Sequence, residues 1–453
     1  MTHLPGMDAP NLLDGLDGLG LRPKPARAKE EARPAATEAA LTVGPKQSPL
    51  VTGSATARAL YKVLAGQDRV IIVKSPPGGG KTEMITTVAG HLANRLGQSF
   101  TIAVATNAQG ASLAHRLVTQ IDPERVVVKL NKIDVSALPR GVRTSAPKTP
   151  PASGQGVVSV RTVASLRRSS GATEQWLLLV DEAYQSTFES VAAAASKFSQ
   201  VMMVGDPGQI GPVVTIDVSA YEKLPEPPHH PAPVVFARHE SAAVLSVDKT
   251  YRLGATTIEA IAPMYDFPFT SARPQRTLSK LSGEVLAEIE HIEHPEVEAS
   301  DDPDLMWTVV HRAASLVGCV LESVERDGTV TERTLEHSDV AVVVALNSQV
   351  SMAQGMLASL GMGGPGGVTV GTADRLQGGE WSAVVALDPM CGSGSAEHNL
   401  TLGRLCTMSS RHSAHLSWVH DGTWRGSLPK AGGSRHARTN RVVRELLTRF
   451  PAS

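Results

Sequence analysis

The feature that most constrains this chain is a glycine-rich loop that ends in Lys-Thr and comes just after an apolar run, 70–73. The loop reads Ser75-Pro76-Pro77-Gly78-Gly79-Gly80-Lys81-Thr82. A strand, such a loop and a following helix together predict a phosphate site. Backbone N–H groups of the loop and the first turn of the helix would surround the phosphates. We expect the whole loop to bind a nucleotide, Lys81 to reach the terminal phosphates and Thr82 to bind Mg²⁺.

A second motif places two carboxylates at the end of another apolar strand, 176–180. The residues that follow are Asp181-Glu182-Ala183-Tyr184-Gln185. Asp181 is predicted to bind the metal, and Glu182 to orient the attacking water. The first position of the phosphate loop is Ser75 rather than the usual glycine, so the loop alone could be a Gly/Pro turn with a chance lysine. The carboxylate-tipped strand argues against that alternative and predicts hydrolysis of a nucleoside triphosphate.

Length and charge limit the remaining possibilities. A chain of 453 residues predicts two domains, because single cores stop growing near about 250–300 residues. The hydrophobic fraction of 42% is sufficient for ordinary globular cores, and the net charge is −1. A nucleic-acid groove would therefore be a local stripe of positive charge rather than a property of the whole surface.

Cysteine usage fits a reducing compartment, and the lack of long apolar runs argues against a membrane span. The three cysteines, Cys319, Cys391 and Cys406, are widely spaced and include no C-x-x-C pair, which argues against zinc and disulfide frameworks. No apolar run approaches the roughly 18 residues of a membrane span, and the N-terminus lacks a signal pattern. We expect a cytoplasmic protein with no membrane partner.

The pattern along the chain predicts a leader and two α/β domains. Residues 1–48 are expected to be mostly disordered, with a leucine-containing segment as a candidate docking helix for a protein partner. Residues 49–238 and 239–453 are predicted to be the N-terminal and C-terminal domains, because strands and helices alternate in both. Predicted strands are 70–74, 101–105, 157–160, 176–180 and 200–204, then 339–344, 368–370, 383–387 and 414–419. Predicted helices include 54–64, 304–322 and a basic, solvated one over 438–450.

One further segment offers two interpretations. His229 and His230 lie in the proline-rich stretch 224–233. Adjacent histidines would suit a metal, but a surface linker between the two domains is the favoured interpretation.

Further segments occur in an order that resembles superfamily 1 helicases, in the branch with DEAxQ motifs that includes the nonsense-mediated-decay RNA helicase and RecD-like DNA helicases. Besides the two motifs above, the resemblance depends on residues 105–109, 205–209, 250–253, 371–380 and 404–411. It extends over residues from about 50 to 425. It implies two RecA-like P-loop domains in tandem, with a nucleotide cleft between them.

The resemblance also implies roles for individual residues. Arg252 and Arg411 would be arginine fingers from the second domain, and Gln209 would sense the γ-phosphate. Glu380 would approach the ribose. ATP and Mg²⁺ would be the cofactors, and the nucleotide state would set the distance between the two domains.

Nucleic-acid contacts are expected at the ends of strands. Thr106, Asn107, Thr162 and Thr372 match the family's contact positions. Hydroxyl and amide groups there suit a sugar–phosphate track. The alternative is that threonine and asparagine simply cap the following helices.

Two departures from the family limit the prediction. Ser54 occupies the position where the family has a glutamine that reads adenine, which weakens the case for ATP over GTP. The gaps between motifs leave room for only a modest accessory element.

We expect an ATP-dependent helicase or translocase that moves 5′ to 3′ on single-stranded nucleic acid, DNA being favoured over RNA. The alternatives are a partner-dependent regulatory ATPase or remodeller, and a binding module that hydrolyses ATP poorly.

Overall fold

The computed structural model describes residues 53–131, 133–145, 154–169, 175–325, 327–392, 400–428 and 433–450. The predicted leader, with its docking segment, lies outside these ranges. Contacts divide the chain into two compact units. The first contains the described parts of 1–75, 80–206 and 211–247, and the second contains 76–79, 207–210 and the described parts of 248–453. The domain bounds expected from the sequence, 49–238 and 239–453, stay a prediction.

A parallel seven-stranded sheet forms the centre of the first unit, in the order β3-β4-β2-β5-β6-β1-β7. Its strands are β1 (Val70–Lys74), β2 (Phe100–Val104), β3 (Val126–Lys129), β4 (Val158–Thr162), β5 (Gln175–Val180), β6 (Phe198–Gly205) and β7 (Ala242–Ser246). The central strands are continuous apolar runs because helices cover both faces of the sheet. The sequence missed β3 and β7, which lie at the two edges.

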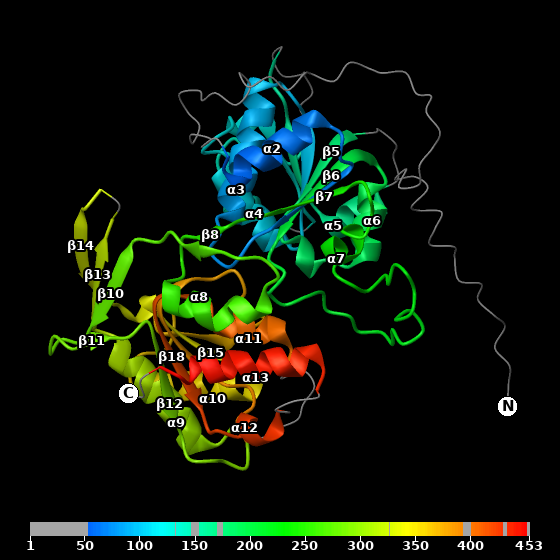
Figure 1. The fold of residues 1–453 in the computed structure, drawn as a ribbon. Helices are drawn as coiled ribbons and strands as arrows, with labels where there is room; N and C mark the ends of the chain where they lie inside the picture. The colour runs from blue at the N-terminus through cyan, green and yellow to red at the C-terminus, as the bar shows by residue number, and fades with distance from the viewer. Residues whose placement is uncertain are drawn as a thin grey trace. The chain divides into compact units, whose positions relative to one another are not determined.

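Helices pack on each face of this sheet (Figure 1). One face carries α2 (Ala55–Ala65), α3 (Lys81–Gly90) and α4 (Asn107–Leu117), and the other carries α5 (Val163–Arg168), α6 (Phe188–Ala195) and α7 (Ala232–Phe236). Helix α2 begins where the Ser54 side chain accepts a hydrogen bond from Ala57 N. It ends at Gly66, whose φ of 62° is unfavourable for other residues. Ser54, which stands where the family has its adenine-reading glutamine, is the N-cap of this helix.

The second unit has a five-stranded parallel sheet in the order β12-β18-β17-β15-β16. Its strands are β12 (Ile289–Glu293), β15 (Val340–Val344), β16 (Thr369–Thr372), β17 (Trp381–Leu387) and β18 (His412–His420). Helices α9 (Pro303–Leu316) and α10 (Asn347–Ser359) pack on one face, and α8 (Ala255–Ile261), α11 (Leu402–Met408) and α13 (Arg435–Leu447) on the other. The four strands predicted in this half are all present, and β12 was missed.

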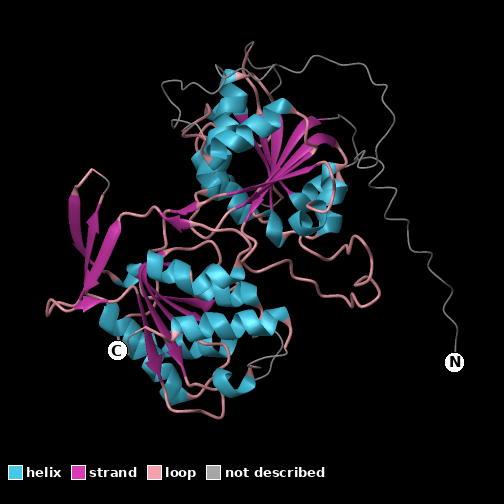
Figure 2. Ribbon diagram, in the orientation of Figure 1, coloured by secondary structure: helices cyan, strands magenta, loops and turns pink. Residues whose placement is uncertain are grey.

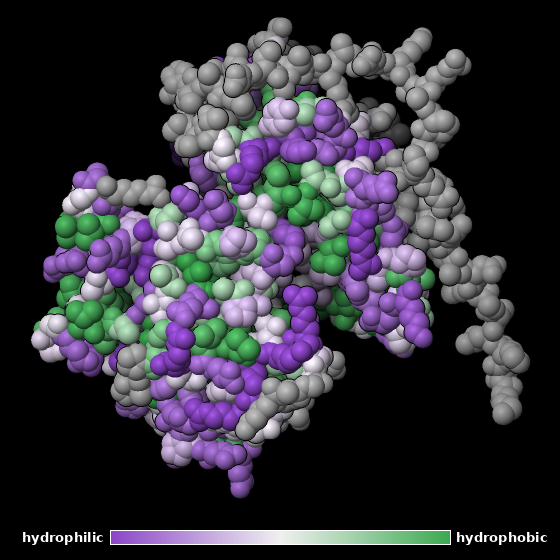
Figure 3. Space-filling view, viewed as in Figure 1, coloured by the Kyte–Doolittle hydropathy of each residue, from purple (hydrophilic) through white to green (hydrophobic). Residues whose placement is uncertain are grey.

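An antiparallel sheet is the accessory element of the second unit (Figure 2). Its order is β11-β10-β13-β14, from β10 (Gln275–Ser279), β11 (Val285–Leu286), β13 (Val320–Val324) and β14 (Val330–Thr334). A helix predicted over 304–322 ends at Leu316 instead, because Gly318 has a φ of +87° and turns the chain into β13. Two exposed apolar side chains belong to this region, Val285 in β11 and Leu281 in the turn between β10 and β11. Green patches are visible in Figure 3 where Figure 1 draws this sheet.

Shorter elements complete the described chain. They are β8 (Lys249–Thr250), β9 (Thr270–Ser271), α12 (Trp424–Ser427) and a π-helical turn, His91–Arg95. Within the described ranges, no helix is both long and apolar enough to cross a membrane.

The terminal helix α13 differs from the solvated basic helix predicted for it. Arg444 is fully buried and donates through Nε to Asp388 Oδ2 at 2.9 Å. Its Nη2 donates to Asp388 Oδ1 at 3.0 Å. Charge composition alone did not reveal this ion pair, because Asp388 ends a distant strand. The predicted α/β fold with two RecA-like parallel-sheet domains in tandem is confirmed, and the nucleotide cleft stays a prediction.

Candidate active site

The phosphate loop connects β1 to α3 through two glycines with left-handed backbone. Gly78 has a φ of 69° and Gly80 a φ of 76°, values that glycine adopts without steric cost. Gly79 N donates to Pro76 O at 3.0 Å, which closes the turn. Helix α3 then begins at Lys81 directly after Gly80, a residue with no side chain to cap it. The first N–H groups of α3 are thereby suited to an anion.

Ser75, which replaces the first glycine of the motif, is fully buried. Its backbone N donates to Gly205 O at 2.9 Å and so ties the start of the loop to the end of β6. The replacement is compatible with the loop because the tie is made by the backbone rather than by the side chain.

The apex of the loop is held by the segment from Thr250 to Arg252. Thr250 Oγ1 donates to Pro77 O at 2.6 Å, and Tyr251 N donates to Gly78 O at 2.9 Å. A Cβ added at Gly78 would lie 2.3 Å from Arg252 Cβ. The loop apex and the first predicted arginine finger are therefore in direct contact, and only glycine leaves room for it.

Lys81, Asp181 and Glu182 come together within the first unit. Lys81 Nζ lies 3.5 Å from Glu182 Oε1. Asp181 is 8% exposed, and its Oδ1 accepts a hydrogen bond from Glu182 N at 2.8 Å. Burial and the nearby Glu182 charge raise the pKa of Asp181 to about 7, although Lys81 and the Glu182 hydrogen bond act in the opposite direction.

Glu182 has an unusual backbone conformation. Among the described residues it is the only one other than glycine with a positive φ, 48°. This conformation costs roughly 1–2 kcal/mol for an L-residue. Such strain clusters at functional sites, and here it occurs at the predicted water-orienting carboxylate.

The second unit brings Arg252, Glu380 and Arg411 together around Ser410. Arg252 Nε lies 2.7 Å from Glu380 Oε2, and its Nη1 donates to Ser410 O at 3.4 Å. Arg411 is 1% exposed and donates to Gly379 O and to Ser410 Oγ. The two predicted fingers and the predicted ribose contact thus form one cluster, in which Arg252 pairs with Glu380.

Gln209 lies in a tightly packed loop of the second unit. Gln377 Nε2 donates to Gln209 Oε1 at 3.3 Å. A Cβ at Gly208 would lie 2.4 Å from Tyr265 Oη, and one at Gly403 would lie 2.7 Å from Gln209 O. Sequence reasoning missed Gln377 and Tyr265. Gln377 belongs to the motif segment 371–380, so it could have been chosen as a candidate from the sequence. Tyr265 lies in no motif segment and could not.

The predicted nucleic-acid contacts have local roles as well. Thr106 forms a capping box with Gln109 at the start of α4, and Thr162 Oγ1 accepts from Ser165 N at the start of α5. Asn107 Nδ2 donates to Asn131 O. Thr372 is buried at the end of β16, where its Oγ1 accepts from Arg375 N at 3.4 Å. A capping hydroxyl accepts a hydrogen bond and retains a proton to donate, so capping and phosphate contact are compatible.

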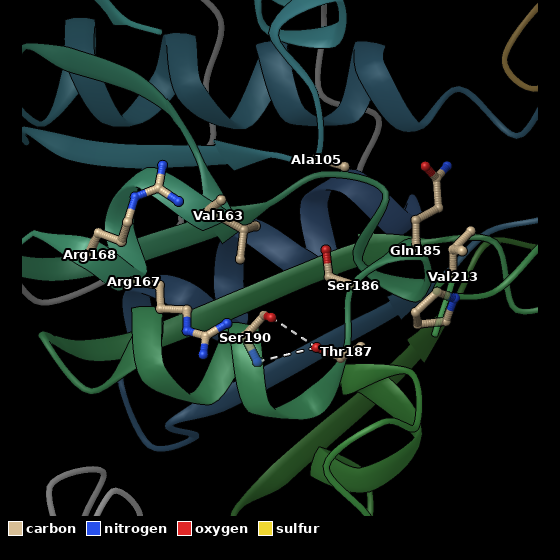
Figure 4. Close-up of a pocket in the computed structure, with 11 residues that line it drawn as sticks. Ala105, Val163, Arg167, Arg168, Gln185, Ser186, Thr187, Ser190 and Val213 are labelled. Atoms are coloured by element: carbon tan, nitrogen blue, oxygen red, sulfur yellow. Dashed lines mark hydrogen bonds between the residues drawn. The ribbon is translucent and has the colours of Figure 1, made fainter. Parts of the chain in front are cut away.

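A cavity of about 510 Å³ is lined by the chain neighbours of two of these threonines, Ala105 before Thr106 and Val163 after Thr162 (Figure 4). It is lined by Ala105, Val163, Ala164, Arg167, Arg168, Gln185, Ser186, Thr187, Ser190, Pro212 and Val213. Arg167 and Arg168 are exposed, and Arg167 Nη2 lies 2.7 Å from Glu189 Oε1. The cavity therefore joins the ends of β2, β4 and β5 to two cations. The cavity could not be predicted from the sequence, because its walls come from separate segments.

Comparisons with known proteins agree with the phosphate-loop assignment. Residues 53–224 match the protein family described as AAA domain. The chain thus resembles superfamily 1 helicases in its P-loop domain and in the order of its motifs, whereas the DEAxQ branch stays a prediction. A search of curated proteins finds no match.

Several solved structures are similar to this chain. One is a complex of the Arterivirus nonstructural protein 10 (helicase) with DNA, with 16% identity and a TM-score of 0.44, covering 80% of this chain and 63% of that one. A second structure of Arterivirus nonstructural protein 10 (helicase) has 17% identity and a TM-score of 0.43, covering 80% and 62%. The PRRSV helicase has 16% identity and a TM-score of 0.40, covering 80% and 54%. The chain spans less than two thirds of each of these helicase chains.

Proposed function

We propose that this protein is an ATP-dependent helicase or translocase that moves on single-stranded nucleic acid. The observation that carries the proposal is the meeting of Lys81, Asp181 and the strained Glu182 in the first unit. That arrangement supplies a cation for phosphates, a buried carboxylate for a metal and a second carboxylate for water.

The nucleotide would be bound mainly by the phosphate loop and by residues of the first unit. Loop N–H groups and the start of α3 would hold the phosphates, and Lys81 would contact the terminal pair. The Thr82 hydroxyl and the Asp181 carboxylate offer the hard oxygen ligands that Mg²⁺ prefers. Bound there, Mg²⁺ would neutralise charge on the phosphate oxygens. Glu182 would orient the attacking water and accept its proton.

The second unit would supply the remaining catalytic groups. We assign Arg252 and Arg411 as arginine fingers, Gln209 as the γ-phosphate sensor and Glu380 as a ribose contact. The Arg252–Glu380 ion pair implies an exchange, because Arg252 must leave or share Glu380 to reach a phosphate. Both arginines donate to Ser410, Arg252 to its backbone oxygen and Arg411 to its hydroxyl.

We assign nucleic-acid contacts to residues at strand ends in each unit. Thr106, Asn107 and Thr162 in the first unit, and Thr372 in the second, would contact the sugar–phosphate backbone. The cavity beside Thr106 and Thr162, with Arg167 and Arg168 in its wall, supports this assignment in the first unit. Such contacts carry no base information. We propose single-stranded DNA ahead of RNA, and movement 5′ to 3′.

A second candidate is a regulatory ATPase or remodeller whose turnover depends on a partner. The Arg252–Glu380 pair favours it, since a partner that separates the pair would activate hydrolysis.

A nucleic-acid-stimulated ATPase assay distinguishes these functions. The full chain is assayed with single-stranded DNA, single-stranded RNA and a forked duplex with a 5′ tail, alongside Glu182→Gln. Stimulated turnover with strand displacement supports the helicase, and stimulated turnover without displacement supports the regulatory ATPase. If the wild type shows no turnover, or if its turnover equals that of Glu182→Gln, both the helicase and the regulatory ATPase are wrong. The remaining function would then be a binding module.

A further inference from the structure

A cluster of metal-ligating side chains lies outside the candidate active site. Glu222, His229 and His230 belong to the first unit, and their ligand atoms all lie within 4.8 Å of one another. The sequence presented the two histidines as part of a linker, and Glu222 was not associated with them. The fold adds the carboxylate because the chain turns back at 227–230, where His230 N donates to Pro227 O.

The separation of the side chains suits a bound cation. His229 Nε2 lies 3.3 Å from Glu222 Oε1. Charge-assisted N–H···O hydrogen bonds are usually shorter, about 2.7–2.9 Å. Two ligands of a tetrahedral Zn²⁺ with bonds of about 2.0–2.1 Å lie about 3.3 Å apart. The His229 and His230 rings meet edge to face, with centroids 4.6 Å apart.

The ligating side chains of the cluster differ in burial. The His229 side chain is 12% exposed, whereas that of Glu222 is 55% exposed. The histidine side of the cluster is therefore more buried, and the carboxylate side is open to solvent.

The backbone anchors the histidines but leaves the carboxylate on a separate turn. His230 O accepts a hydrogen bond from Phe188 N at 2.8 Å, and Pro228 O accepts one from Glu189 N at 3.1 Å. The histidines are thus fixed to the first turn of α6. Glu222 lies in a turn in which Leu224 N donates to Tyr221 O. A shared ion would join this turn to α6.

We propose that Glu222, His229 and His230 bind one Zn²⁺ ion that fastens the 211–231 loop to α6. Two imidazoles and one carboxylate are ligands that zinc accepts readily, with water in the fourth position. Mg²⁺ and Ca²⁺ prefer oxygen ligands throughout. The proposal does not depend on the proposed ATPase, because none of the three residues belongs to the phosphate or carboxylate motifs.

Metal titration of the tag-free full chain tests the site. After treatment with EDTA and dialysis, Zn²⁺ is titrated by calorimetry, and Co²⁺ is added separately to detect tetrahedral absorption bands. We expect one ion per chain in the wild type. Glu222→Gln and His230→Gln should each weaken binding about tenfold or more.

Two control variants locate the bound ion. His239→Gln removes another histidine of this region, whose Nε2 lies 3.0 Å from Glu226 Oε1, and should leave the affinity unchanged. Asp181→Asn removes the proposed Mg²⁺ ligand and should also leave Zn²⁺ binding unchanged. Loss of binding in either control, or binding that persists in the Glu222→Gln/His230→Gln double variant, would overturn the assignment.

Limited trypsin digestion provides a second readout that does not depend on affinity. Lys223 is exposed next to Glu222, so cleavage after it should slow when Zn²⁺ is bound. Metal-free wild type and His230→Gln should be cut equally fast, which also shows that the variant is folded. If the wild type binds no Zn²⁺, or if Zn²⁺ leaves cleavage at Lys223 unchanged, the proposed Zn²⁺ site is wrong.

Discussion

At the scale of single residues, Glu182 combines backbone strain with the predicted catalytic carboxylate. Its φ of 48° is expensive for glutamate and inexpensive for glycine. We therefore expect function and stability to separate at this position. Glu182→Gln and Glu182→Gly should both lower the ATPase rate by about 10²–10⁴-fold. Glu182→Gly should match or exceed the wild-type unfolding free energy, by up to about 1 kcal/mol.

Steady-state turnover and urea unfolding measure the two effects. A clearly less stable Glu182→Gly variant would show that the strained backbone is not what the structure indicates. An active Glu182→Gln variant would remove Glu182 from the proposed mechanism.

Glu380 provides a second residue-scale prediction, since it pairs with Arg252 at 2.7 Å. Glu380→Gln removes the charge that holds the proposed finger. A partly exposed pair of this kind contributes at most about 1 kcal/mol, so we expect basal kcat to rise by no more than about fivefold. KM for ATP should also rise, because a ribose contact is lost.

Asp374→Asn is the matched control for that substitution. It removes the partner of Arg404, which lies 3.1 Å away in an ion pair of similar exposure. Kinetics at saturating and limiting ATP separate the two parameters. An unchanged or lower kcat in Glu380→Gln would mean that the ion pair does not restrain Arg252.

At the scale of elements, hydrophobic pattern and turn chemistry predicted much of the two parallel sheets. Five strands of the first unit and four of the second were predicted, because buried parallel strands are continuous apolar runs. The edge strand β3 is short, and β12 reads IEHIE, with buried Glu290 in place of an apolar residue. β12 therefore lacked the pattern that identifies a buried strand, whereas β3 has that pattern over only three residues, 126–128.

The site was less predictable than the fold. Motif spacing selected Lys81 and Glu182, and the structure places them 3.5 Å apart. Motif spacing gave no indication that Arg252 pairs with Glu380, because that contact joins segments far apart in the chain. Buried partners of charged groups follow from tertiary packing, and sequence patterns do not encode them.

Another element-scale prediction concerns the loop apex. Gly78→Ala would place a Cβ 2.3 Å from Arg252 Cβ while φ is +69°. We expect this substitution to weaken ATP binding at least tenfold, because the apex must shift away from the Thr250–Arg252 segment. Fluorescent-nucleotide titration measures the loss, and thermal unfolding reports the accompanying strain.

Gly361→Ala separates backbone strain from collision. Gly361 has a similar φ, +73°, but a Cβ there would meet no atom within 4 Å. This control should lose stability without losing nucleotide affinity. Equal affinity in the two variants would exclude the contact at Arg252 as the reason for the glycine.

At the scale of the whole molecule, acid stability should depend on a buried network in the second unit. Burial alone would raise the pKa of Glu290. Hydrogen bonds from His415 and Ser417 and the charge of Arg312 outweigh burial and lower this pKa to about 2. Ser417 Oγ and Arg312 Nη2 both lie 2.5 Å from Glu290 Oε1. The folded chain therefore favours the charged carboxylate more than the unfolded chain does.

The resulting stabilisation is fully present above the unfolded pKa near 4.5 and is lost as pH falls toward 2. It amounts to roughly 3 kcal/mol. Urea unfolding between pH 6 and 3 should show a steeper loss for the wild type than for Glu290→Gln. Glu293→Gln, at an exposed pair with Arg425, should keep most of the wild-type slope. Parallel slopes for wild type and Glu290→Gln would contradict this account.

Because of the strand order of the first unit, Gly205 lies next to both the phosphate loop and the carboxylate segment. β6 runs between β1, which leads to the phosphate loop, and β5, which leads to the carboxylates. Its last residue, Gly205, accepts the Ser75 N–H, and a Cβ there would lie 2.8 Å from Tyr184 Cδ2 and 3.1 Å from Ala183 N. A methyl group at position 205 would push on the segment that carries the water-orienting carboxylate and on the strand end that anchors the phosphate loop. Phosphate binding and the orientation of water thus both depend on the absence of a side chain at position 205.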